Sequence, residues 1–341
     1  MKSGIVEKLK NGIVLGAEGY LFELERRGYL KAGAFVPEVV LDHPHAVEEL
    51  HREFLRAGAE VMVAFTYYAH REKLKVIGRE KDLEPMNRHA LQIAKKIAKE
   101  GSALVAGNIC NTWAYNPARH KETSKIVRDM YREQVQWAKE EGADFIIAET
   151  IEYVGEALIA LEVIKEFGFP ALVTFGATYE KSKDNVDWIE GCKLLEKNGA
   201  DIVGFNCIRG PKTMLPLLEK LRQEVNCFIA AQPVPYRTTK KQPAFQFLKQ
   251  SDDSLAFPTN LDPHLCTRSE LADFALKAQE IGVNYIGICC GAGPHHVRSM
   301  AESLGRIVAS SRYSPDMSQH GLLGNKKVVK QHERQYLDLW K

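Results

Sequence analysis

Short apolar runs alternate with longer amphipathic segments along most of the chain. The apolar runs are rich in Val, Ile and Phe and have the length of buried strands. They occupy residues 12–16, 60–66, 103–108, 144–149, 171–175, 201–206, 227–232 and 284–289. The amphipathic segments repeat apolar residues every three or four positions, which predicts helices. The clearest of these helices are expected at 45–58, 87–101, 124–142, 187–199 and 269–282.

This alternation of strands and helices predicts the fold. It is typical of a parallel sheet with right-handed crossovers, and eight units within roughly 300 residues match a closed (β/α)8 TIM barrel. The alternative is an open doubly wound sheet with a second domain, but no GxGxxG motif follows the first run. We expect the catalytic barrel to span residues 1–310. The Pro-containing insertion 233–267 would then cover the mouth of the barrel.

The segment 311–341 does not continue the pattern. It is basic and irregular and ends in a short amphipathic piece. We interpret it as a C-terminal oligomerisation arm that lies at a subunit interface. The sequence therefore predicts a homo-oligomer, either a dimer or a tetramer.

Charge and composition narrow the range of partners. The chain of 341 residues has 46 Lys and Arg against 44 Asp and Glu, a net charge of +2, so neither a nucleic acid nor a membrane is expected as a partner. No apolar run approaches the roughly 20 residues of a membrane span, and no signal peptide is recognisable, which predicts a cytoplasmic protein. Seven cysteines are an odd number for a disulfide framework and indicate free thiols or metal ligands.

Three cysteines lie where a barrel has its active site, at the carboxyl ends of strands. Cys207 follows the sixth run, and the adjacent Cys289 and Cys290 close the eighth run just before Gly291 and Gly293. Three thiolates would hold a tetrahedral zinc ion and leave one position open, as in catalytic zinc sites. The alternatives are that Cys207 is a buried apolar residue and that the cysteine pair is inert or a redox couple.

An open zinc site made of thiolates suits a sulfur nucleophile. It would hold an incoming thiol as thiolate, which could displace a methyl group from a cationic donor in one in-line step. Phe35, Tyr67 and Tyr68 could offer aromatic faces to an onium group, although core packing is the alternative. Glu149 closes the fourth run and is expected to meet the amino group of a substrate, or else a neighbouring Lys or Arg. Asn206 is expected to orient Cys207.

With these residues the chain resembles the homocysteine S-methyltransferase family, and most closely its betaine-dependent branch. The matching stretches are ELERRGYLKAG (23–33), HREFLRAGAEVMVAFTYYA (51–69), IIAE (146–149), IVGFNC (202–207), AQP (231–233) and YIGICCGAGPHHVRSMAE (285–302). The resemblance implies a zinc-dependent barrel that transfers a methyl group from an onium donor, betaine first, to homocysteine and makes methionine. It also implies Cys207, Cys289 and Cys290 as zinc ligands, Glu149 near the homocysteine amino group, and Tyr67 and Tyr68 near the donor. No catalytic residue beyond the metal ligands is implied.

The chain departs from the family pattern at the substrate positions. Ala17, Glu18 and Gly19 stand where the family has Asp-Gly-Gly, and Ala17 and Glu18 are therefore substrate-binding candidates. Phe35 aligns with a Trp and Thr150 with a Tyr of the betaine branch, which leaves room for a different onium donor. The other hypotheses are a dimethylsulfonium compound or S-methylmethionine as donor, a corrinoid partner protein as methyl source, and a catalytically silent zinc-binding barrel.

Overall fold

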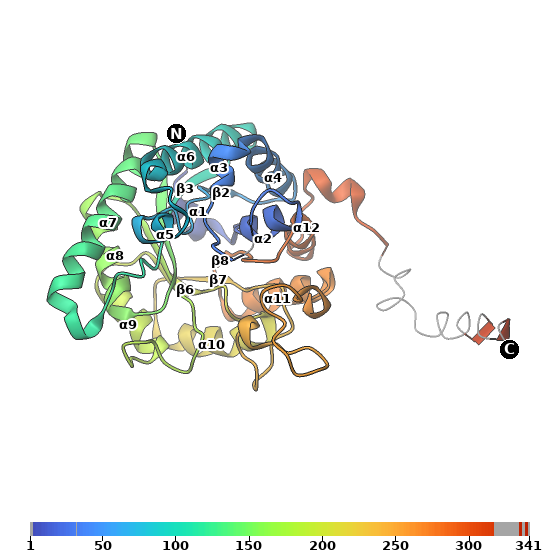
Figure 1. Ribbon diagram of the computed structural model, residues 1–341. Coiled ribbons are helices and arrows are strands. Elements are labelled where there is room, and N and C mark those ends of the chain that lie inside the picture. Colours follow the sequence, from blue (N-terminus) through green and yellow to red (C-terminus); the bar gives the residue numbers. More distant parts are fainter. Residues whose placement is uncertain (1–2, 32, 317–333, 336–337, 340–341) are drawn as a thin grey trace.

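Parallel strands form the centre of the protein and helices surround them, as the computed structural model shows for residues 3–31, 33–316, 334–335 and 338–339 (Figure 1). The strands are β1 (Val14–Leu15), β2 (Val61–Val63), β3 (Leu104–Cys110), β4 (Phe145–Ile151), β5 (Ala171–Phe175), β6 (Ile202–Asn206), β7 (Phe228–Gln232) and β8 (Tyr285–Ile286). Each lies within one of the runs predicted from the sequence or overlaps it. Nearly every strand residue is buried, as expected for a parallel sheet that is covered on both faces.

The sheet has the order β1-β8-β7-β6-β5-β4-β3-β2, and every pairing is parallel. Its two outer strands meet, because the backbone N–H of Glu60, just before β2, donates to the carbonyl of Leu15 in β1 at 2.8 Å. The Glu60 carboxylate also accepts from the Leu15 N–H at 3.0 Å. The strands follow one another without a reversal of order, which confirms the (β/α)8 TIM barrel and excludes the doubly wound alternative.

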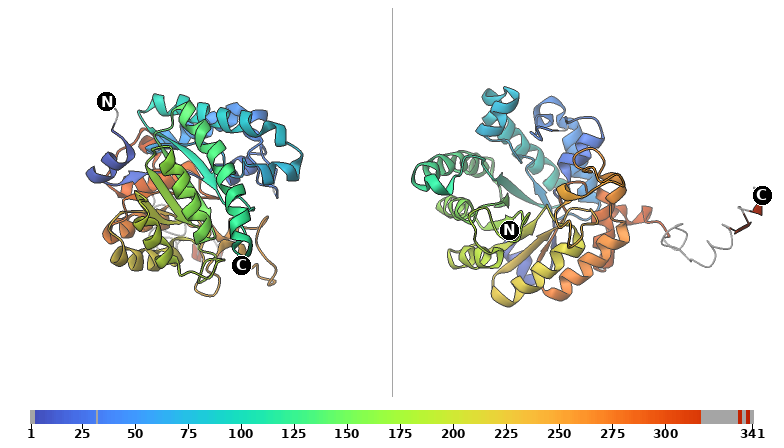
Figure 2. Two further views of the ribbon diagram at one scale, coloured as in Figure 1. Left: turned by 90° about the vertical axis from the view of Figure 1, so that its left-hand side faces the viewer. Right: turned by 60° about the horizontal axis from the view of Figure 1, so that its bottom comes forward.

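Helices pack around the outside of the barrel, as Figure 2 shows from two further directions. They are α1 (Ile5–Asn11), α2 (Tyr20–Arg26), α3 (Val39–Asp42), α4 (Pro44–Arg56), α5 (Arg71–Ile77), α6 (Leu83–Glu100), α7 (His120–Glu141), α8 (Val154–Glu166), α9 (Trp188–Lys197), α10 (Pro211–Glu224), α11 (Arg268–Ile281) and α12 (Pro294–Ser303). The five helices predicted from periodicity all form. The helices α7 and α11 end at Gly142 and Gly282, whose φ values of 78° and 90° are left-handed, as a glycine stop requires.

Two strands end earlier than their apolar runs predict. β2 ends at Val63, and β8 ends at Ile286. Tyr67, Tyr68, Cys289 and Cys290 therefore lie in the loops beyond these strands. Outside a strand the side chains of neighbouring residues no longer alternate between two faces, so adjacent cysteines can serve one site.

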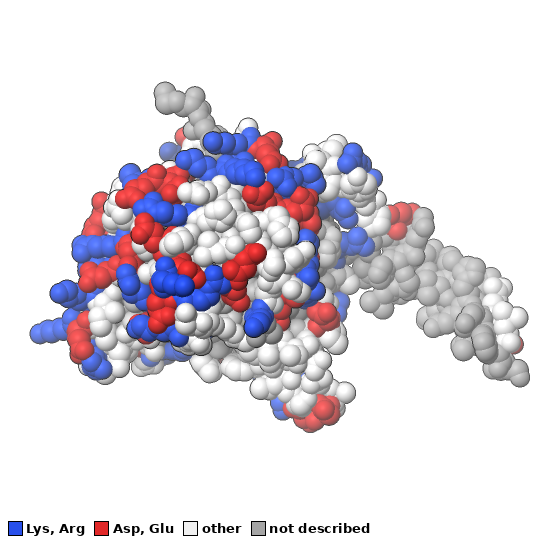
Figure 3. Space-filling model, turned by 45° about the horizontal axis from the view of Figure 1, so that its top comes forward, with Lys and Arg blue, Asp and Glu red and all other residues white. Residues whose placement is uncertain are grey.

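The face of the molecule drawn in Figure 3 carries charges of both signs. Lys and Arg are intermixed with Asp and Glu over the face drawn in Figure 3. In the described part of the chain, no helix combines the length and the apolar composition needed to cross a membrane. Most of the predicted arm 311–341 lies outside the described residues, so its oligomerising role and the domain boundary at 310 stay predictions.

Burial of one histidine in the outer layer predicts acid sensitivity. His51 in α4 is fully buried against Tyr20, with ring centroids 4.5 Å apart, and neither of its ring nitrogens has a hydrogen-bond partner among the described residues. Burial lowers the pKa of His51 to about 3. Because an unfolded histidine has a pKa of about 6.5, the unfolded chain binds more protons between these values, and stability is lost as the pH falls below about 6.5.

Replacing His51 with phenylalanine is expected to flatten this dependence. Between about pH 3 and about pH 6.5, the slope of the unfolding free energy against pH should be smaller than that of the wild type by about 1.4 kcal/mol per pH unit. Urea unfolding at about pH 6.5 and about pH 5 measures the difference. His45→Asn, at an exposed position of the same helix, is the control and should keep the wild-type slope. A slope in His51→Phe equal to that of the wild type would contradict the prediction.

Candidate metal and substrate site

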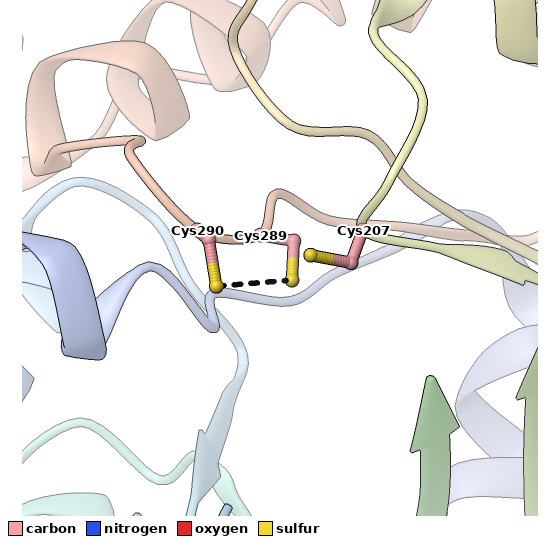
Figure 4. Close-up of side chains that lie close together, drawn as sticks. All are labelled: Cys207, Cys289 and Cys290. Carbon is pink, nitrogen blue, oxygen red and sulfur yellow. Dashed lines mark hydrogen bonds between the residues drawn. The ribbon is translucent and has the colours of Figure 1, made fainter. Parts of the chain in front are cut away.

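Three thiols meet at the mouth of the barrel. The sulfur atoms of Cys207, Cys289 and Cys290 all lie within 4.8 Å of one another. Figure 4 shows the sulfurs of Cys289 and Cys290 projecting to the same side while that of Cys207 points toward them from the end of β6. Cys207 and Cys289 are buried, and Cys290 is half-buried. The structure thus brings together the three cysteines that the sequence singled out.

Unusual backbone conformations position these thiols. Cys207 and Ile208 have φ values of 52° and 50°, a left-handed conformation that is rare for residues with a Cβ. The Cys207 N–H is fixed by a bond of 2.8 Å to the Gln232 carbonyl at the end of β7. After the cysteine pair, Gly291 turns the chain with φ of 93°, and a Cβ there would lie 2.2 Å from the Tyr236 hydroxyl. The turn predicted at this glycine is confirmed.

The arrangement fits a tetrahedral zinc ion. Thiolate ligands about 2.3 Å from a tetrahedral zinc lie roughly 3.8 Å from one another. The Cys289 and Cys290 sulfurs are 4.0 Å apart, and the largest separation in the cluster stays below 4.8 Å. Three soft donors at this spacing suit zinc better than magnesium or calcium.

The electrostatics of the cluster also favour a cation. Hydrogen bonds from Cys289 and Cys290 lower the pKa of Cys207 well below its ordinary value. The same interactions with Cys207 raise the pKa values of Cys289 and Cys290. One thiolate is therefore stabilised by its neighbours, whereas three thiolates together need a positive ion.

Two buried carboxyl groups lie beside the thiols. Glu149 in β4 accepts hydrogen bonds from the amide groups of Asn108, at 2.6 Å, and Asn206, at 2.8 Å. Glu18, from the loop before α2, is also buried, and neither of its oxygens has a partner among the described residues. Burial raises the pKa of both carboxyl groups, and the charge of Glu149 raises that of Glu18 further. Two buried carboxyl groups in one place favour a cationic ligand between them.

A bulge in β4 directs Glu149 into the site. The register of β4 against β5 shifts between Ala148 and Ile151, and Thr150 takes a left-handed φ of 55°. Such bulges commonly redirect a side chain next to an active site. The Asn206 amide oxygen accepts from the Thr150 N–H at 2.7 Å and holds the bulge. The side chain of Asn206 thus orients Glu149 and Thr150 rather than Cys207, which corrects the role expected from the sequence.

A small inner cavity connects the carboxyl groups with the thiols. Its volume is about 20 Å³, and Glu18, Glu149 and all three cysteines line it. This is room for one water-sized group, such as an ammonium. Two polar atoms of its lining, the Tyr20 hydroxyl and Asn108 Oδ1, have no hydrogen-bond partner among the described residues. The Tyr285 hydroxyl and the Gln232 amide, which lie near Glu18 outside this lining, have none either. Unpaired buried polar atoms are costly, so they indicate a place for a polar ligand.

A larger aromatic cavity adjoins the thiols and the inner cavity. Its volume is about 340 Å³, and Cys207 and Cys290 line it together with Glu152, the single charged side chain among its described lining residues. Its aromatic lining consists of Phe22, Phe35, Tyr67, Tyr68, Tyr179, Phe245, Phe247 and Phe257. Aromatic faces with one carboxylate favour a cation that carries alkyl groups.

The substrate candidates are divided between the two cavities. Phe35 and Tyr68 line the aromatic cavity, and Tyr67 lines both cavities. Glu18 and Glu149 line the inner cavity. Ala17 is fully buried and lines neither of them.

Sequence reasoning missed several residues around the site. Asn108 and Gln232 are the last residues of two predicted strands. Residues at the carboxyl ends of barrel strands lie at the active site, and this rule, which identified Glu149, could have identified them too. The aromatic residues at 245, 247 and 257 belong to the insertion 233–267, and they confirm that this segment covers the mouth. Nothing in the sequence indicated Tyr20 or Tyr285 as site residues.

Comparison with known proteins agrees with this geometry. The family model for homocysteine S-methyltransferase matches residues 18–304. The chain belongs to the homocysteine S-methyltransferase family. It is therefore a methyltransferase.

Individual relatives of this family add detail. Betaine–homocysteine S-methyltransferase 1 of Xenopus tropicalis is 37% identical over 338 residues, which is 95% of this chain and 80% of the relative. S-methylmethionine–homocysteine S-methyltransferase BHMT2 of Mus musculus is also 37% identical, over 89% of this chain and 82% of the relative. The metallated form of the homocysteine methyltransferase MmuM from Escherichia coli shares the fold, with a TM-score of 0.67, 20% identity, and coverage of 85% of this chain and 96% of that structure.

Proposed function

We propose that the protein transfers a methyl group from an onium donor, betaine in the first place, to the thiol of homocysteine and thereby makes methionine. One observation carries the proposal: the thiol cluster borders both cavities. Cys207 and Cys290 line both the inner polar cavity and the aromatic cavity. An acceptor and a donor bound in these adjoining cavities would bring the acceptor sulfur and the donor methyl carbon together beside the cluster, where the sulfur could approach that carbon opposite the breaking bond.

In this proposal Cys207, Cys289 and Cys290 hold a zinc ion. When bound, zinc would supply the charge that keeps an incoming thiol deprotonated at neutral pH. The spacing and softness of the three sulfurs support this cofactor.

The inner cavity would receive the ammonium group of homocysteine. Glu149 and Glu18 would receive its ammonium group, and Asn108 and Asn206 would hold the Glu149 carboxylate in position through the bonds described above. Each carboxyl group would lose its proton as the ammonium arrives, because the cation offsets the charge that burial disfavours.

The aromatic cavity would bind the donor. Phe35, Tyr67 and Tyr68 would surround its onium group and replace its water. The homocysteine sulfur would form a bond to the donor methyl carbon while the bond from that carbon to the donor nitrogen breaks. The electron pair of the broken bond would stay on the nitrogen, which gives dimethylglycine when betaine is the donor.

S-methylmethionine is the second candidate donor. The mouse relative that is named for it is as similar to this chain as the betaine-dependent relative. S-methylmethionine carries an ammonium group besides its sulfonium group, and this ammonium could pair with Glu152, which lines the aromatic cavity. Glu152 already accepts from Lys183 at 2.6 Å, so this pairing would have to compete with that ion pair.

A donor screen tests the proposed function. Zinc-loaded protein is mixed with homocysteine and, in separate reactions, with betaine, S-methylmethionine or a dimethylsulfonium carboxylate, and methionine is measured. Methionine from at least one of these donors is expected without any added protein. Methionine that forms only after a methylated corrinoid protein is added would favour the corrinoid hypothesis instead. The cytoplasmic location and the dimeric or tetrameric assembly stay predictions.

A further inference from the structure

A buried lysine next to the aromatic cavity pairs with rings instead of carboxylates. The ammonium nitrogen of Lys73, in α5, lies 3.9 Å from the centroid of the Trp113 ring and 4.3 Å from that of Tyr68. It donates a hydrogen bond of 3.0 Å to the Ala34 carbonyl. The residue is 4% exposed, and it has no salt bridge within the described part of the chain. Two aromatic faces and a carbonyl thus compensate a charge that has lost most of its water.

The two rings belong to loops that are conformationally constrained. Tyr68 follows β2 and Trp113 follows β3, and their φ values are 63° and 64°. Left-handed backbone is unfavourable for residues of this size and persists only where surrounding contacts hold it. The rings also meet edge to face, with centroids 5.6 Å apart. Lys73 contacts both rings, so it ties the two loops to α5.

The side chain of Tyr68 lines two neighbouring cavities. It lines the aromatic cavity and also a neighbouring cavity of about 340 Å³ that Trp113 and Lys183 line. Its ring packs against that of Tyr67, with centroids 4.2 Å apart and the ring planes tilted by 39°. The position of the Tyr68 ring therefore determines where the proposed donor cavity ends.

We propose that Lys73 is a positioning residue for the methyl donor, an inference that rests on the function proposed above. Lys73 fixes Tyr68 and Trp113 through cation–π contacts, and the fixed Tyr68 ring confines the onium group beside the thiols. Lys73 itself does not touch the donor. The charge of Lys73 alone would repel an onium group, so charge repulsion predicts that its removal lowers the KM for the donor. The positioning role predicts that its removal raises this KM.

Kinetics of Lys73→Met distinguish these effects. The KM for the onium donor is expected to rise about tenfold while the KM for homocysteine stays within about twofold. Lys73→Arg keeps the charge and the affinity for aromatic faces and should restore the donor KM to within about threefold of wild type. Lys75→Met, at an exposed position of the same helix, is the matched control and should change neither KM.

Other results would overturn the proposal. They are an unchanged or lowered donor KM in Lys73→Met, an equal rise of both KM values, and a failure of Lys73→Arg to recover donor affinity. Should Lys73→Met not fold, Trp113→Leu serves instead, because Trp113 is 59% exposed and its loss leaves the core intact. This variant should also raise only the donor KM.

A spectroscopic readout separates this proposal from the proposed function. The emission of Trp113, obtained as the difference between wild type and Trp113→Phe, is expected to change in Lys73→Met because the ammonium leaves the indole face. Wild-type protein that makes no methionine from any onium donor would refute the proposed function. An emission that stays unchanged in Lys73→Met would refute the cation–π contact itself, whether or not the enzyme turns over.

Discussion

Replacing Cys289 with alanine is expected to leave a folded protein without zinc and without methyl transfer. The three thiols are mutually within 4.8 Å, so each would supply one of three protein ligands. Losing one ligand leaves two thiolates, which cannot complete the site, and the thiol of the acceptor would no longer be held deprotonated at neutral pH. Metal analysis should fall from about one zinc per chain to nearly none, and turnover should fall at least about 1000-fold.

The control for this experiment is another free cysteine. Cys227 lies next to β7, is half-buried and is not part of the cluster. Cys227→Ala should keep the metal content and the activity of the wild type. Full zinc content in Cys289→Ala would refute the ligand assignment, and full activity without zinc would refute the need for the metal.

The sequence predicted the barrel and the thiol cluster for one physical reason. A parallel strand is buried on both faces and reads as a short apolar run, and the residue that ends the run lies at the rim where the active site forms. This reasoning located Cys207 and Glu149 correctly. For Cys289 and Cys290 it also needed the turn at Gly291, whose left-handed backbone the structure confirms.

The shape of the site could not be predicted in the same way. Whether a ring such as Tyr68 faces a cavity or the core depends on contacts with distant segments, here Trp113 and Lys73. The aromatic lining from the insertion 233–267 depends on how an irregular segment folds back over the mouth. Sequence periodicity carries no information about such packing.

The loop before α2 places an acidic side chain that the sequence alone could not locate. By the resemblance described in the sequence analysis, Ala17-Glu18-Gly19 takes the place of an Asp-Gly-Gly stretch, which suggested that the acidic group had moved or been lost. In the structure the Glu18 carboxyl reaches the inner cavity beside Glu149. Gly19 allows this loop to pass close to the chain before α12, since a Cβ at Gly19 would lie 2.2 Å from the Ala292 carbonyl oxygen.

Replacing Glu18 with glutamine is therefore expected to weaken homocysteine binding while donor binding stays the same. Glutamine has nearly the same shape and can still donate a hydrogen bond to the neighbouring Glu149 carboxylate. It removes one of the two charges that would face the substrate ammonium. The KM for homocysteine should rise about 100-fold, as for other buried charge pairs that lose one partner, and the KM for the donor should change less than about twofold. Steady-state kinetics with each substrate varied in turn measure both.

Glu156→Gln provides the matched control for Glu18→Gln. Glu156 in α8 is also a buried carboxyl group with a raised pKa, caused by burial, but it accepts from the Thr112 N–H and hydroxyl and lines neither of the two proposed substrate cavities. Its replacement should leave the homocysteine KM near that of the wild type. If Glu18→Gln leaves the homocysteine KM unchanged, the Glu18 carboxylate does not recognise the acceptor. Glu149 would then be the counter-ion of the homocysteine ammonium group in this buried cavity, without help from Glu18.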